Sequence, residues 1–144
     1  MKIIITESQY KKLFKEEKEQ KVLKIPSMKF FNNDWFLLQK FLESKGNPPY
    51  SIGGYLDLRE TQIKSLGNLQ TVGDYLDLEG TLIKSLENLQ SVGSSLNLRG
   101  IQIKSLGNLQ SVGGDLDLVG TPLSKMYTKS QIRGMVNVGG EIYF

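Results

Sequence analysis

The most constraining feature of this sequence is a block of twenty residues that recurs along the chain. SIGGYLDLRETQIKSLGNLQ begins at residue 51, TVGDYLDLEGTLIKSLENLQ at residue 71 and SVGSSLNLRGIQIKSLGNLQ at residue 91. A fourth, more divergent block begins at residue 111, and QIRGMVNVGGEIYF from Gln131 reads as a fifth, truncated copy. A fixed period of this length predicts one small structural unit per repeat, and such units bury a core only by stacking.

The apolar residues of these blocks fall in fixed columns when residue 51 is numbered position 1. Positions 2, 6, 8, 13, 16 and 19 are aliphatic in the first three repeats. Leu at positions 6 and 8 with a polar residue between them predicts a short strand whose leucines face the core. Extending the register to the end of the chain places Val136, Met126 and Tyr143 in core columns 6, 16 and 13. Glycine recurs at positions 3 and 10, where we expect a tight turn or a positive φ.

The pattern L-x-L-x-x-T-x-I, as in LDLRETQI and LDLEGTLI, resembles the strand core of leucine-rich-repeat proteins with short, 20-residue bacterial-type repeats. The resemblance covers residues 51–144. It implies an α/β solenoid of about five coils with a parallel β-sheet, and a buried polar group that ladders from coil to coil. Thr61, Thr81 and Thr121 hold that position here, and Ile101 interrupts it. The opening MKIIITESQYKKLF is similar to the starts of small bacteriophage proteins.

A stack of repeats needs covered ends, so we divide the chain into two parts. Residues 1–49 are predicted to form a helical N-terminal cap, and residues 50–144 the solenoid, with a C-terminal cap from about residue 124. Thr6-Glu7-Ser8-Gln9 has the pattern of a capping box and predicts a helix over residues 7–19.

Two further helices are predicted near the ends of the repeats. Trp35, Leu38 and Leu42 have helical spacing, which predicts a helix from about Asn33 to Gly46 that packs on the first repeat. The aromatic-rich FFNNDWFLLQKF in this region is alternatively a partner site. Residues 128–131, TKSQ, form a second capping-box pattern and predict a short helix in the fourth repeat, followed by a closing strand.

Composition excludes several kinds of site. The chain has no cysteine and no histidine, so it has no disulfide, no thiolate or imidazole metal site and no histidine base. MKIIITESQYKK has too few apolar residues for a signal-peptide core, and no apolar run has the length of a membrane span. We therefore expect a cytoplasmic protein without a membrane or cofactor partner. Nucleic acid is not an expected partner either, because the lysines of the basic N-terminal part are interleaved with glutamates.

The candidate functional surface consists of the side chains that alternate with the inward leucines, at positions 5, 7 and 9. These columns vary between repeats and combine tyrosine, carboxylates and arginine, the first and last of which often dominate binding energies. The candidate partner-binding residues are Tyr55, Asp57, Arg59, Tyr75, Asp77, Glu79 and Arg99. In the register above, Met135, Asn137 and Gly139 continue the three columns in the last copy.

Other chemistries fit the same residues less well. The column of Asp57, Asp77 and Asp117 suggests paired catalytic acids or calcium ligands, but a flat sheet offers no sheltered site. A column of Lys64, Lys84 and Lys104 on the next face is either an anion site or a solubilising, anti-aggregation feature; we favour the latter.

We therefore expect a non-enzymatic module that binds a partner protein through the variable sheet face, as an inhibitor or adaptor. The alternative is a structural subunit, for example of a phage particle, that assembles through its end strands or cap. A monomer fits the first function and self-assembly the second.

Overall fold

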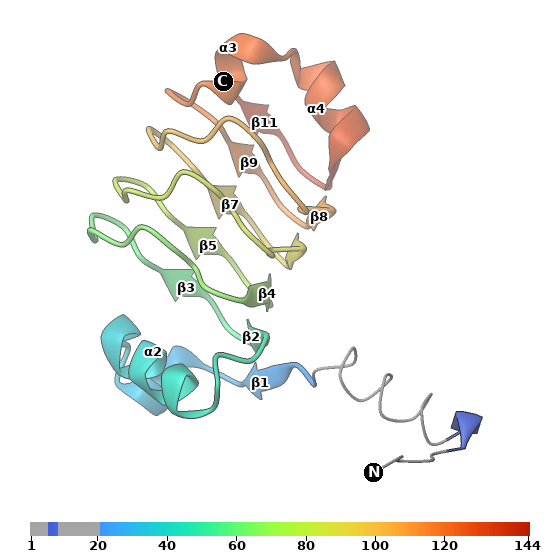
Figure 1. Cartoon of the computed structure of the whole chain (residues 1–144). Helices are drawn as coiled ribbons and strands as arrows, with labels where there is room; N and C mark the ends of the chain where they lie inside the picture. The colour runs from blue at the N-terminus through green and yellow to red at the C-terminus, as the bar shows by residue number, and fades with distance from the viewer. Residues whose placement is uncertain (1–5, 9–20) are drawn as a thin grey trace.

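The computed structural model describes residues 6–8 and 21–144, and these form two parallel β-sheets with short helices towards both ends (Figure 1). Sheet A has six strands, β1 (Leu23–Ile25), β2 (Tyr50–Ile52), β4 (Leu69–Val72), β6 (Ser91–Val92), β8 (Ser111–Val112) and β10 (Asn137–Val138). Sheet B has five, β3 (Leu56–Asp57), β5 (Leu76–Asp77), β7 (Leu96–Asn97), β9 (Leu116–Asp117) and β11 (Ile142–Tyr143). The helical segments are η1 (Met28–Phe31), α2 (Trp35–Ser44), α3 (Leu123–Met126) and α4 (Lys129–Met135). The helix predicted over residues 7–19 lies almost wholly outside the described residues.

Consecutive repeats pair strand to strand in a twenty-residue register. In sheet B, Leu56 lies opposite Leu76, which lies opposite Leu96 in the next strand. The Leu56 N–H donates to the carbonyl of Tyr75 at 2.9 Å, and later repeats copy this bond. The predicted strand at position 6 and its parallel pairing are therefore confirmed. Sheet A was not predicted, because the part of its strands that recurs from repeat to repeat is only positions 1 and 2, and two residues are too few to show alternation.

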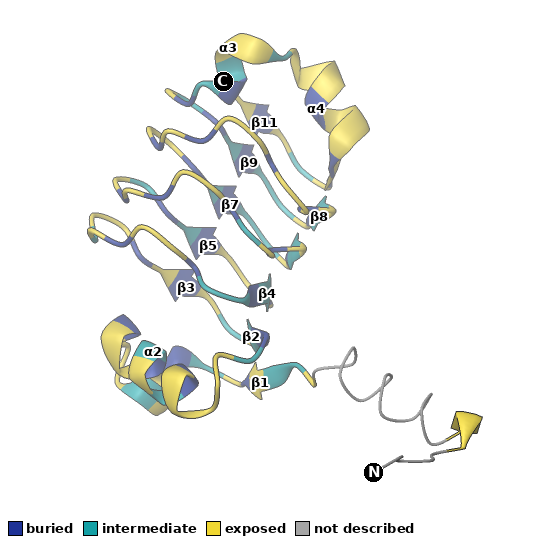
Figure 2. Cartoon of the chain, in the orientation of Figure 1, coloured by how far each residue is buried: buried dark blue, intermediate teal, exposed yellow. Residues whose placement is uncertain are grey.

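The core lies between the two sheets and is made of the aliphatic columns (Figure 2). Leu96 and Leu98 have no exposed surface, and Ile103 in the same repeat has none either. Because parallel pairing places identical side chains over one another, each leucine packs on its counterparts in the repeats before and after it. The prediction that positions 6, 8 and 13 face the core is therefore confirmed for the first three repeats.

The two glycine columns have different physical causes. At position 3, a Cβ on Gly73, Gly93 or Gly113 would overlap the carbonyl oxygen of the preceding repeat, so glycine is needed for close approach of two backbones. At position 10 the requirement is conformational, because the φ of Gly100 is +74°. Glu60 holds this position in the first repeat with a φ of +57°.

The N-terminal part before residue 49 contains a strand as well as helices. Strand β1 pairs in parallel with β2 and adds a sixth strand to sheet A. Helix α2 begins after Asp34, whose carboxylate accepts hydrogen bonds from two backbone N–H groups of the first turn. Leu38 and Leu42 are buried as predicted, but Phe30 and Phe36 are 73% and 71% exposed. The aromatic stretch is therefore only partly core.

At the other end, the capping-box helix is confirmed as α4, but the register predicted beyond it is wrong. Val138 pairs with Val112, and Ile142 pairs with Leu116, so the equivalent residues here are 26 apart rather than 20. In the fourth repeat, α3 and α4 take the place of segments that are extended in the earlier repeats. A helix rises less than half as much per residue as a strand, so it uses more residues to cover the same path.

This shift moves several side chains out of the columns assigned from the sequence. Met126 and Tyr143 are 53% and 45% exposed and do not belong to the core columns. Val136 is buried, but it ends α4 instead of occupying a sheet B strand. Met135, Asn137 and Gly139 do not continue columns 5, 7 and 9. In the last copy, Glu141 holds position 5 and Tyr143 holds position 7.

The threonines do not form a ladder between repeats. The hydroxyl of Thr61 donates to the carbonyl of Leu58 at 2.7 Å, and that of Thr81 to Leu78 at 2.8 Å, in each case within its own repeat. Thr121 does the same in the fourth repeat. A single hydroxyl satisfies the nearest free carbonyl across the turn and has no second donor for the neighbouring repeat.

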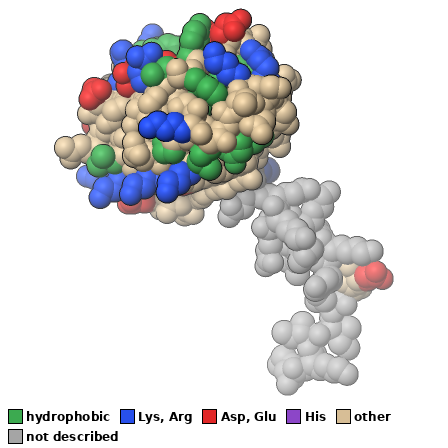
Figure 3. Space-filling view, turned by 90° about the horizontal axis from the view of Figure 1, so that it is seen from above, with side chains coloured by type: hydrophobic (Ala, Val, Ile, Leu, Met, Phe, Trp, Pro, Cys, Tyr) green, Lys and Arg blue, Asp and Glu red, His purple; other side chains and the backbone are tan. Residues whose placement is uncertain are grey.

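The C-terminal edge of sheet A is closed by one arginine. In the inner repeats the carbonyls at positions 2 and 4 accept N–H groups from the following repeat. In the last repeat, the guanidinium of Arg133 in α4 donates to the equivalent carbonyls, those of Val138 and Gly140, at 3.0 and 2.7 Å. Figure 3, which views the molecule from above, shows basic side chains interspersed with acidic and hydrophobic ones at this end. A charged, occupied edge disfavours the addition of another strand there.

Candidate functional site

The outer face of sheet B brings the candidate residues of positions 5, 7 and 9 together. Tyr55 and Tyr75 come from successive repeats, and the parallel register of β3 and β5 places one ring over the other. The ring centroids are 5.0 Å apart and the planes differ by 12°. The two residues remain 42% and 37% exposed. Packing against each other leaves each tyrosine less free to rotate than a lone surface side chain.

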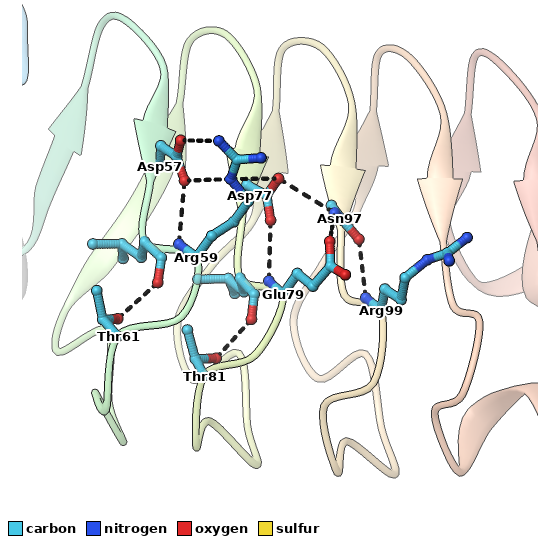
Figure 4. A network of polar contacts seen from close by, with 10 residues as sticks. Asp57, Arg59, Thr61, Asp77, Glu79, Thr81, Asn97 and Arg99 are labelled. Atoms are coloured by element: carbon cyan, nitrogen blue, oxygen red, sulfur yellow. Dashed lines mark hydrogen bonds and ion pairs between the residues drawn. The ribbon is translucent and has the colours of Figure 1, made fainter.

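Arg59 holds the carboxylates beside the tyrosines. Its guanidinium forms an ion pair with Asp57 at 2.9 Å and reaches Asp77 of the next repeat at 3.6 Å (Figure 4). The hydrogen bond from Arg59 lowers the pKa of the Asp57 carboxyl below its ordinary value. Burial raises the pKa of the Tyr75 phenol, and the nearby Asp57 carboxylate adds to that rise. The guanidinium of Arg59 is therefore shared between the carboxylates of two successive repeats.

The polar network continues into the third repeat through Asn97, which was not assigned to the site from the sequence. Its amide nitrogen donates to Asp77 at 3.3 Å and to Glu79 at 3.1 Å. Arg99 then pairs with Asp117 of the fourth repeat at 3.3 Å. Each of these carboxylates therefore faces a side-chain donor from its own or a neighbouring repeat. The asparagine that interrupts the aspartate column supplies a donor between carboxylates.

Position 7 also has a structural task that explains its constancy. The side-chain oxygen of Asp57 accepts the backbone N–H of Arg59 at 3.2 Å, two residues further on. Asp77, Asn97 and Asp117 accept the equivalent N–H at 3.0 Å. This local turn favours aspartate or asparagine at position 7 in every repeat. Surface variation that bears on recognition is therefore concentrated at positions 5 and 9.

A pocket of about 290 Å³ adjoins the tyrosine pair at the N-terminal edge of sheet B. One wall is formed by cap residues and the other by β3 and its flanking residues. The lining residues are Met28, Asn33, Tyr55, Leu56, Asp57 and Leu58. No signal in the repeat pattern indicates this pocket, because it lies where the repeats give way to the cap.

The lysine column lies on the neighbouring face, where its side chains are exposed. Lys64 and Lys84 border a groove of about 560 Å³. Leu82, which replaces the Gln62 and Gln102 of the adjacent repeats, is 49% exposed in this groove. This surface is separate from the outer face of sheet B and provides a comparison surface for binding experiments.

Within the described ranges, no group of three or more carboxylates is placed to hold a metal ion. The aspartates proposed as calcium ligands bond to Arg59, Arg99 and Asn97 instead. Among the same residues, no helix has the length and apolar character needed to cross a bilayer.

The structure thus gathers all seven candidate residues on one face, and Asn97 and Asp117 join their polar network. Figure 4 shows the part of that network that runs from Asp57 to Arg99. Comparison with protein-family models, curated proteins and solved structures finds no match for this chain. Its function is therefore inferred from its own residues.

Proposed function

We propose that this protein is a leucine-rich-repeat-like solenoid and a non-enzymatic module that binds a partner protein through the outer face of sheet B. The binding residues are Tyr55, Asp57, Arg59, Tyr75, Asp77, Glu79 and Arg99. The module acts as an inhibitor or adaptor, needs no cofactor, and uses the N-terminal half of the face as its main contact.

The observation that carries this proposal is the stacked, half-exposed pair Tyr55 and Tyr75. Aromatic and arginine side chains contribute most of the energy in typical interfaces, and a pair that is already ordered loses little entropy on binding. The ion pairs of Arg59 hold the surrounding charges in fixed positions, which favours selection of a partner with complementary charge. Flat, open geometry suits a protein surface better than a small substrate.

The alternative, a subunit that polymerises end to end, fits these edges less well. Arg133 occupies the C-terminal edge of sheet A. Among the described residues, sheet A extends one strand beyond sheet B at the N-terminal end, whereas at the C-terminal end the last strands of both sheets belong to the same repeat. When two copies stack head to tail and β10 of one pairs with β1 of the next, β11 and β3 are therefore left one strand apart and cannot pair. A filament would need such head-to-tail contacts to repeat from copy to copy.

The first experiment compares capture of proteins from a lysate of the native host by the wild-type chain and by a double variant, Tyr55→Ser with Tyr75→Ser. Serine already occupies this column at Ser95, so folding should be retained. Loss of a dominant aromatic costs about 2 kcal/mol or more, so capture of the partner should weaken at least tenfold.

The matched control is the pair Lys64→Ser and Lys84→Ser on the neighbouring face, which should leave capture unchanged. Loss of capture in the lysine pair but not in the tyrosine pair would assign binding to the basic column and refute the proposal. Sedimentation velocity over a range of concentrations tests the alternative. A monomer at all concentrations supports the binding module, and concentration-dependent growth supports the assembly subunit.

A further inference from the structure

Sheet B ends one strand short of sheet A at the N-terminal end. Strand β1 pairs with β2 and continues sheet A, whereas among the described residues sheet B stops at β3. The place that a sixth strand of sheet B would take adjoins the 290 Å³ pocket between β3 and the cap residues Met28 and Asn33. The edge of a sheet, a pocket and the tyrosine pair therefore meet at one point.

The outer edge of β3 carries the backbone groups that an added strand requires. The N–H groups of Leu56 and Leu58 donate to β5 at 2.9 Å. Because backbone groups alternate in direction along a strand, the N–H and C=O of Asp57 and the C=O of Tyr55 point to the opposite edge. The edge therefore offers one donor and two acceptors in the spacing of a parallel strand.

The side chains at this edge indicate the chemistry of the strand that fits. Tyr55 stacks on Tyr75 and also lines the pocket, so an aromatic ring on the added strand would extend the stack. Asp57 has the more exposed side chain, at 29% against 15% for Asp77. Further along the column, Asp77 lies between two donors, Arg59 on one side and Asn97 on the other. The side chain beside Asp57 should therefore also be a donor, and a cation is favoured because the face is rich in carboxylates.

We propose that the partner protein inserts an extended segment beside β3 as a parallel sixth strand of sheet B. The segment has an aromatic residue over Tyr55, a lysine or arginine beside Asp57, and an aliphatic residue on each side of that cation. Such strand addition takes its affinity from backbone hydrogen bonds and its specificity from alternate side chains. It rests on the proposed function, because it specifies how the partner engages the same face.

The test uses a fluorescein-labelled peptide, Gly-Asp-Tyr-Leu-Lys-Leu-Arg-Gly, with the full chain and fluorescence anisotropy. In the repeat register, the first leucine directs its N–H to β3 and the lysine directs its N–H away. N-methylation of that leucine should therefore weaken binding about tenfold, and N-methylation of the lysine by less than about threefold. Equal effects of the two methyl groups, or the absence of saturable binding by the unmethylated peptide, would overturn the proposal.

A pair of protein variants tests the same edge from the other side. Asp57→Ala and Asp57→Pro both remove the carboxylate, but only proline also removes the outward N–H, and proline is tolerated on an edge strand. The proline variant should bind the peptide at least fivefold more weakly than the alanine variant, with an unchanged circular dichroism spectrum. Similar affinities would place the peptide elsewhere and overturn the proposal. The methylated peptides keep the test valid if the proline variant does not fold.

The outcome can be separated from that of the proposed function. If Asp57→Pro captures the host partner as well as Asp57→Ala does, while the tyrosine pair is required, strand addition fails and the binding face stands. If capture does not need the tyrosines, both fail. If the chain sediments as a dimer and the peptide dissociates that dimer, the occupant of the site is a second copy of the chain, which also overturns the proposal.

Discussion

Replacing Gly93 with alanine is expected to be among the most damaging small changes in this protein. A Cβ at this position would overlap the carbonyl oxygen of Gly73 and lie 2.8 Å from its carbonyl carbon. The two repeats must then move apart, which lengthens the bond from the Gly93 N–H to Val72 (2.8 Å) and that from Ser94 to Asp74 (3.2 Å). Two weakened hydrogen bonds at about 1 kcal/mol each, with overpacking of about 1 to 3 kcal/mol, predict a loss of about 3 to 5 kcal/mol.

Two other glycines provide matched controls for this substitution. Gly100→Ala meets no atom within 4 Å, but its φ of +74° should cost about 1 kcal/mol. Gly134→Ala lies in α4, has no such φ and also meets no atom within 4 Å, so it should raise the free energy of unfolding by about 0.5 to 1 kcal/mol. Urea unfolding followed by circular dichroism measures all three. If Gly93→Ala lowers the free energy of unfolding no more than Gly100→Ala does, close contact between the two backbones is not the reason for glycine at position 3.

Three further outcomes are expected. Leu96→Ala, fully buried between neighbouring repeats, should lower the free energy of unfolding by about 2 to 5 kcal/mol in urea, whereas Lys104→Ala on the exposed face should change it little; equal losses would contradict the inward assignment. Arg133→Ala removes two charge-assisted hydrogen bonds and should cost about 1 to 3 kcal/mol; Arg133→Lys, without the fork of donors, should recover only part of this in the same assay. Arg59→Ala should raise the pKa of Asp57 towards its ordinary value in an NMR titration of the carboxyl. Because that pKa is lowered in the folded state, the stability from this pair is present above the ordinary carboxyl range and is lost as the pH falls through the folded value; an unchanged pKa in the variant would refute the pairing.

Repetition and alternation allowed much of the architecture to be derived without coordinates. The leucines at positions 6 and 8 indicated a strand with one inward face, and the twenty-residue period indicated parallel pairing between equal positions. The capping box at Thr128 located α4, and the spacing of Leu38 and Leu42 located α2. These features can be predicted from the sequence because each depends on residues close in sequence or on a pattern that the chain repeats.

The candidate binding face was also predicted from the sequence, since alternation along a strand directs the side chains at positions 5, 7 and 9 away from the core. The stacking of Tyr55 on Tyr75 followed from the same register. The part played by Asn97 did not, because an amide between two carboxylates is recognised only when the distances to both are known. The turn formed by each position-7 oxygen was missed for a simpler reason: aspartate columns also suggest metal ligands, and only the hydrogen bonds distinguish the two.

Tertiary structure alone decided how the repeats end. The sequence contains the clue to the true register of the last copy, since VGGEI from Val138 matches VGGDL from Val112, but a strict period conceals it. The length of chain in the fourth repeat depends on α4 packing in place of an extended segment. Likewise, strand β1 and Arg133 meet groups that the repeats leave unpaired at the two ends of sheet A. A repeating pattern specifies the contacts between equal units, but the end units lack a neighbour, and their unpaired groups are satisfied by residues outside the pattern.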